Sequence, residues 1–126
     1  MKLKDCHNFY DFRKLAKKKL PSPIFNYIDG GSDDEVTLKR NTESFNKCDL
    51  IPNVLTDVSN VDLSTTIFGQ KISFPLFLSP TSMHRLYHHE GEKGSARAAE
   101  KKGTMFSMST MATTSIEEIG NLASGP

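Results

Sequence analysis

The chain has 126 residues, of which 37% are hydrophobic and 25% are charged, as is usual for a globular domain. Its formal net charge of +1 gives no reason to expect a nucleic-acid partner. No apolar run approaches the roughly 20 residues of a membrane-spanning helix, and the start of the chain lacks the apolar core of a signal peptide.

The first predicted helix covers residues 8–19. Its apolar side chains recur at helical spacing, Asn8 can cap its amino end, and Pro21 ends it. The Lys17-Lys18-Lys19 run can be read as a contact for anionic lipid. Cations at the negative end of a helix dipole explain the same run without a partner.

Two further helices are expected before residue 46. Pro23 is favoured at the first position of a helix, and that helix should end at Gly30-Gly31. Residues 32–35, Ser-Asp-Asp-Glu, have the spacing of a capping box and predict a third helix that continues to about Phe45. A helical segment over about residues 8–46 therefore opens the chain.

A short β-hairpin is predicted next, over about residues 61–74. Residues 61–68 and 71–74 have strand character, and Gly69-Gln70 between them has the composition of a tight turn.

Two βα units follow, over about residues 74–123. Apolar runs at 74–78 and 104–108 each end in small polar residues, and helix-like stretches follow at 90–102 and 115–123. This alternation is typical of a parallel α/β protein, in which ligands bind at the carboxyl ends of the strands.

The loops after the two strands hold the first candidate binding residues. Pro80, Thr81 and Ser82 have small side chains that let a ligand approach the backbone, and Ser109 and Thr110 offer hydroxyl groups. Small residues also make tight turns between strands and helices, so composition alone leaves a structural role open.

Tyr27 is another candidate, because it stands close to the Gly30-Gly31 break. Its ring could project from the helix end, and its phenol could donate a hydrogen bond to a carboxylate. The alternative is that Tyr27 fills the core beside Ile24, Phe25 and Ile28.

No motif for a metal or a nucleotide is present. His84, His88 and His89 lack the spacing of metal ligands and are expected on the surface or in a turn. The chain has no GxGxxG, P-loop, GxSxG or HExxH pattern. Cys6 and Cys48 match no zinc or redox spacing and are expected to be free thiols.

Six motifs in order resemble one known family, the FMN-dependent 2-hydroxy acid dehydrogenases and oxidases, which include L-lactate dehydrogenases and glycolate oxidases. The resemblance begins at about Phe9 and corresponds to the family's amino-terminal third. The motifs are Phe25-Asn26-Tyr27-Ile28-Asp29-Gly30-Gly31, Asp57 to Thr66, Phe74-Pro75 with Pro80-Thr81-Ser82-Met83, Gly91-Glu92 with Ala96-Arg97-Ala98-Ala99, Ser109-Thr110, and Ser115-Ile116-Glu117-Glu118.

The resemblance implies a TIM (β/α)8 barrel, of which residues 1–126 would be the amino-terminal portion with a helical preamble and a β-hairpin. It implies FMN as cofactor. The backbone at Pro80, Thr81 and Ser82 would lie against the flavin ring, Ser109 would hydrogen-bond the flavin, and Tyr27 would bind the substrate carboxylate.

The implied reaction is oxidation of a small L-2-hydroxy acid, with L-lactate as the expected substrate, to the 2-oxo acid. A quinone, a cytochrome or oxygen would reoxidise the flavin. The family's catalytic histidine would lie beyond Pro126, so no catalytic residue is expected in this chain, which alone should be inactive. The full-length protein is expected to be a cytoplasmic homo-oligomer, with the inner face of the membrane as an alternative location.

Two positions depart from the family pattern. Ser82 stands where many members have alanine or glycine, and Met111 stands where some oxidases have a tryptophan near the substrate side chain.

The sequence leaves two other functions open. One is a non-catalytic flavin-binding or interaction fragment, and the other is a related FMN barrel with a different reaction, such as diphosphate isomerisation.

Overall fold

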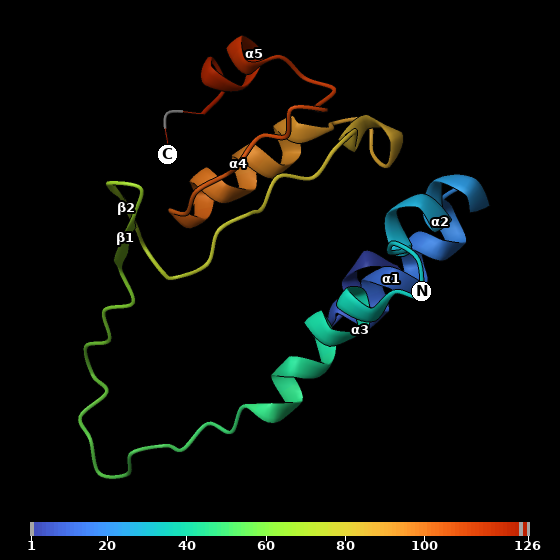
Figure 1. Cartoon of the computed structure of the whole chain (residues 1–126). Helices are drawn as coiled ribbons and strands as arrows, with labels where there is room; N and C mark the ends of the chain where they lie inside the picture. The colour runs from blue at the N-terminus through green and yellow to red at the C-terminus, as the bar shows by residue number, and fades with distance from the viewer. Residues whose placement is uncertain (1, 124, 126) are drawn as a thin grey trace. The chain divides into compact units, whose positions relative to one another are not determined.

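The computed structural model describes residues 2–123 and residue 125. The chain divides between Thr56 and Asp57 into two compact units, each of which is described by itself. The first unit is helical, and the second holds the hairpin and the two βα units (Figure 1).

The first unit confirms the first two predicted helices. Its elements are η1 (Leu3–Asp5), α1 (Phe9–Lys19), α2 (Ser22–Asp29), α3 (Val36–Glu43) and η2 (Ser44–Lys47). Asn8 caps α1, because its side chain accepts a 3.0 Å hydrogen bond from the Asp11 N–H. Arg13 on α1 holds both carboxylate oxygens of Asp29 on α2, at 2.5 and 2.8 Å.

The capping box predicted at residues 32–35 is wrong. Helix α3 begins only at Val36, and its N-cap, Glu35, adopts a left-handed conformation with φ 58° and no side-chain capping bond. The Glu35 carboxylate instead turns back to accept from the Gly31 N–H at 3.2 Å, and the Glu35 N–H donates to the Ser32 carbonyl at 2.9 Å. The Glu35 N–H and the Glu35 carboxylate, which a capping box would have used, are therefore engaged in a local turn.

The predicted hairpin exists, but its turn lies one residue earlier than expected. Strands β1 (Thr65–Ile67) and β2 (Gln70–Ile72) are antiparallel, and Ile67 pairs with Gln70. The turn is thus Phe68-Gly69, with φ of 50° and 79°, and positive φ at both positions is what a type I′ turn requires. Gln70 is a strand residue, and Ile72 is almost completely buried.

The two segments that follow run parallel, as predicted, although their regular pairing is limited to the bridge between Leu78 and Phe106. The Leu78 N–H donates to the Met105 carbonyl, and the Ser107 N–H donates to the Leu78 carbonyl, each at 3.0 Å. This slanted pattern is that of a parallel ladder.

Each parallel segment leads into a helix, α4 (Glu92–Lys102) and α5 (Ile116–Gly120), with a short 3-10 turn, η3 (His84–Leu86), before α4. Helix α5 is shorter than the predicted 115–123. Its predicted cap is confirmed, because Ser115 and Glu118 form a reciprocal capping box. The buried apolar residues of this unit are Ile72 of β2, Ala96 and Ala99 of α4, and Met105 of the second segment.

Candidate functional site

The candidate site is built by the loops after the two parallel segments, residues 79–83 and 107–114, called loop 1 and loop 2 below. The Met83 N–H of loop 1 donates to the Met111 carbonyl of loop 2 at 3.0 Å. Two residues after loop 1, the Arg85 N–H donates to the Thr113 hydroxyl at 3.2 Å. The loops are therefore in direct contact at the strand ends, where parallel α/β proteins bind ligands.

Loop 1 offers open backbone donors to a ligand. Pro80 and Thr81 are exposed, and Ser82 is partly buried. Among the described residues, none accepts a hydrogen bond from the N–H of Thr81 or Ser82. Small side chains and two N–H groups without an internal acceptor leave this backbone able to bind an external acceptor.

The Ser109 hydroxyl accepts a hydrogen bond within its own turn and still has a proton that it can donate. Its hydroxyl oxygen accepts from the Met111 N–H at 3.1 Å, and its carbonyl accepts from the Ala112 N–H at 3.1 Å. Ser109 therefore stabilises its own turn, which was one of the two interpretations of this residue. A hydroxyl that accepts one bond can still donate its proton elsewhere, so the turn does not exclude ligand binding.

Glu92 belongs to one of the six sequence motifs, but the sequence analysis assigned it no role in the site. Its side chain is fully buried and accepts four hydrogen bonds, one from the turn after loop 1 and three from loop 2. Oε1 accepts from the backbone N–H groups of His84 (3.2 Å) and Thr113 (2.8 Å). Oε2 accepts from the hydroxyls of Thr113 and Thr114, both at 2.8 Å.

These bonds keep the Glu92 carboxylate ionised. Burial by itself would raise the pKa of the Glu92 carboxyl, but the bonds from Thr113 and Thr114 outweigh it and lower the pKa to about 2. In the sequence, a glutamate in the first turn of a helix has an ordinary explanation in the helix dipole. The available signals were the Gly91-Glu92 motif of the family resemblance and Gly91 itself, which can admit an unusual backbone conformation.

His84, His88 and His89 make contacts with neighbouring side chains and form no metal site among the described residues. His84 lies in η3, with its Nδ1 3.4 Å from the Ser95 hydroxyl and its ring edge-on to Phe106. The rings of His88 and His89 lie 4.3 Å apart. In the described part of the chain, no group of three His, Cys, Asp or Glu residues could hold a metal ion. Cys6 and Cys48 are free thiols, as predicted.

Tyr27 lies on α2 of the first unit and is 59% exposed. The core position of this helix is occupied by Phe25, which is 5% exposed. The interpretation of Tyr27 as core filler is therefore wrong, and its phenol is open to solvent or a ligand.

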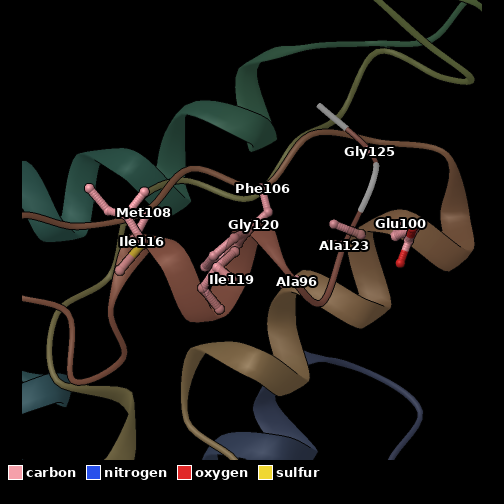
Figure 2. Close-up of a pocket in the computed structure, with 10 residues that line it drawn as sticks. Ala96, Glu100, Phe106, Met108, Ile116, Ile119, Gly120, Ala123 and Gly125 are labelled. Atoms are coloured by element: carbon pink, nitrogen blue, oxygen red, sulfur yellow. The ribbon is translucent and has the colours of Figure 1, made fainter.

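An apolar hollow of about 300 Å³ lies between α4 and α5 (Figure 2). Phe106 and Met108 from the second parallel segment line it, together with Ile116 and Ile119 of α5. These apolar side chains offer few hydrogen-bonding groups to a polar ligand, in contrast to the two loops.

A family model described as FMN-dependent dehydrogenase matches residues 16–126. This chain belongs to that family. Glycolate oxidase 1 of Oryza sativa subsp. indica is 41% identical over 118 residues, which cover 94% of this chain and 32% of the relative. The predicted family resemblance is thus confirmed.

Solved structures agree with this assignment. A soluble mutant of the membrane-associated (S)-mandelate dehydrogenase from Pseudomonas putida is 36% identical with a TM-score of 0.86, over 94% of this chain and 34% of that one. A protein named as a lactate oxidase from Pediococcus acidilactici is 33% identical with a TM-score of 0.87, over 97% and 34%. The chain thus spans about a third of the length of these relatives.

FMN is the cofactor of this family, and the residues at the loops fit it. The polar edge of a flavin ring carries nitrogens and carbonyls that accept hydrogen bonds. Loop 1 presents two N–H groups without an internal acceptor, and Ser109 presents a hydroxyl proton.

Among the described residues, no helix has the length and apolar character that crossing a membrane needs.

Proposed function

We propose that the full-length protein oxidises a small L-2-hydroxy acid, with L-lactate as the first candidate, to the 2-oxo acid with FMN. The observation that carries the proposal is the contact between loops 1 and 2, which gathers open hydrogen-bond donors at one end of the parallel strands. The named relatives support it, because they are a glycolate oxidase, a mandelate dehydrogenase and a lactate oxidase.

Each candidate residue has a distinct part in this proposal. The backbone of Pro80, Thr81 and Ser82 lies against the flavin, Ser109 donates its hydroxyl proton to the ring, and the Tyr27 phenol donates to the substrate carboxylate. FMN, when bound, accepts the two electrons that leave the substrate carbon. No histidine of this chain is proposed as the base that takes the substrate proton.

The proposal extends to the whole protein. Its fold is a TIM barrel in which residues 74–123 form the first two βα units. Its electron acceptor is a quinone, a cytochrome or oxygen, and it is a homo-oligomer in the cytoplasm or at the inner face of the membrane. The membrane-associated mandelate dehydrogenase among the relatives supports keeping the second location.

Steady-state turnover of the purified full-length protein tests this function. L-lactate, glycolate and (S)-mandelate would be compared, each with oxygen and with a soluble quinone as acceptor. We expect formation of the matching 2-oxo acid with at least one of the three substrates. Bound flavin without turnover of any of them would instead favour a non-catalytic flavin protein or another reaction, such as isomerisation of a diphosphate.

Ser109→Ala is expected to weaken FMN binding about 3- to 10-fold, because one neutral hydrogen bond to the ring is lost. The flavin reduction potential should shift as well. Titration of the apoprotein with FMN, followed by flavin fluorescence, measures the affinity. Ser109→Thr, which keeps the hydroxyl, is the matched control, and an affinity of Ser109→Ala equal to wild type would remove this residue from the site.

Tyr27→Phe is expected to raise the KM for the hydroxy acid about 10-fold or more, as the loss of one hydrogen bond to a charged carboxylate predicts. FMN affinity should stay at the wild-type value, because the lost contact is to substrate. Tyr10→Phe removes another exposed phenol of the first unit and serves as control. Unchanged KM in Tyr27→Phe would contradict the assignment.

A further inference from the structure

We propose that Glu92 is a positioning residue for the FMN site: its buried carboxylate fastens the turn after loop 1 to loop 2 and so sets where their donors meet the flavin. This inference rests on the proposed function. It assigns a role in cofactor geometry to a residue that itself lies too deep to touch FMN.

The bonding of Glu92 is divided between the two sides of the site. On one side it accepts from the His84 N–H, two residues after Ser82. On the other side it accepts three bonds from Thr113 and Thr114, which end loop 2. The Glu92 side chain therefore fixes the distance between two segments of the protein. One segment carries the backbone donors of loop 1, and the other carries Ser109.

The backbone around Glu92 is arranged to deliver this carboxylate. Gly91 has φ 57° and ψ −141°, a conformation that is essentially restricted to glycine. Helix α4 begins immediately after it, with Glu92 as its first residue. Other links between the loops are single bonds, such as the one between Met83 and Met111.

Substitutions of Glu92 can separate the effect of side-chain length from the effect of its charge. Aspartate keeps the charge, but it is one methylene shorter and cannot span both sides. Glutamine keeps the reach and loses the charge, since its carbonyl can accept from the His84 and Thr113 N–H groups. Its amide can then donate to the hydroxyl oxygens of Thr113 and Thr114, which can rotate to accept. A positioning role predicts that glutamine preserves the site better than aspartate.

The test compares the full-length holoprotein with its Glu92→Gln, Glu92→Asp and Glu92→Ala variants. FMN affinity, the visible spectrum of bound flavin and the reduction potential are measured. We expect Glu92→Gln to bind FMN within about 3-fold of wild type, and the other two to lose tenfold or more, with a shifted spectrum and potential.

Two controls separate positioning from a general loss of stability. Leu15→Ala removes a buried side chain from the first unit, and Glu117→Gln removes an exposed carboxyl from α5. Both should bind FMN like wild type. Thr114→Val removes one donor to Glu92 while Thr114→Ser keeps it, so this pair gives a milder form of the same test if the Glu92 variants fail to fold.

The outcomes are decisive in each direction. Wild-type FMN affinity, spectrum and potential in Glu92→Ala, or in Thr114→Val, would overturn the positioning role. A variant set in which Glu92→Asp behaves like wild type and Glu92→Gln does not would also overturn it, because charge and not reach would then matter. If the wild-type protein itself binds no FMN, the proposed function fails, which is a different result.

Discussion

Replacing Gly91 with alanine is expected to lower the free energy of unfolding by about 2–4 kcal/mol. The Gly91 backbone has φ 57° and ψ −141°, which residues with a side chain avoid. A Cβ at this position would also lie 2.8 Å from Cγ of Arg85, closer than such atoms pack. Strain and collision therefore act together at the point where α4 begins.

Urea denaturation of the full-length protein measures this loss. The matched control is Gly120→Ala, since Gly120 is the last residue of α5 and a Cβ there would meet nothing within 4 Å. That variant should keep wild-type stability or gain up to about 1 kcal/mol from the higher helix propensity of alanine. Equal stability of Gly91→Ala and Gly120→Ala would mean that the conformation at Gly91 is not required.

Acid is expected to destabilise the protein through Glu92. The folded-state pKa of about 2 lies below the ordinary value of 4.5, so the ionised carboxylate stabilises the folded protein when the pH is above the ordinary value. That contribution, about 3 kcal/mol at neutral pH, is lost as the pH falls from the ordinary value through the folded-state one. Between about pH 6 and pH 3 the loss should be about 2 kcal/mol.

Glu92→Gln isolates this effect from the other carboxylates. The difference in unfolding free energy between wild type and Glu92→Gln should shrink by about 2 kcal/mol on going from about pH 6 to pH 3. Urea titrations at both pH values measure it, and Glu117→Gln provides the comparison for an exposed carboxyl. A difference that stays constant with pH would show that Glu92 is not held ionised by its bonds.

Local signals in the sequence predicted local structure well. Asn8 caps α1, Ser115 and Glu118 form their capping box, and the two apolar runs that end in small residues lie parallel. In each case the residues concerned bond to near neighbours, or follow a periodicity that the fold preserves. The position of both loops at the carboxyl ends of parallel segments also followed from this pattern, but the contact between the loops was not predicted.

Two predictions of local structure were wrong, one at a side chain and one at a turn in the backbone. Glu35 has the spacing for a capping box, but its carboxylate takes the Gly31 N–H instead. In the hairpin, Phe68 accepts a positive φ that the sequence alone would assign only to glycine, and this moves the turn by one residue. Neither choice is visible in the spacing.

Glu92 was missed for a different reason. Its partners lie 8 to 22 residues away along the chain, and they meet it only when the two loops come together. A glutamate at the start of a helix carries no mark of such bonds in the sequence. Tyr27 shows the reverse case, since neighbouring apolar residues suggested burial and the structure leaves it exposed.

Anaerobic addition of L-lactate to the purified full-length protein tests the central claim most directly. We expect the protein to carry FMN and its visible absorption to bleach, with one pyruvate formed for each flavin reduced, while D-lactate leaves the spectrum unchanged. A protein without flavin would contradict FMN-dependent oxidation of a 2-hydroxy acid. So would a bound flavin that L-lactate, glycolate and (S)-mandelate all fail to reduce.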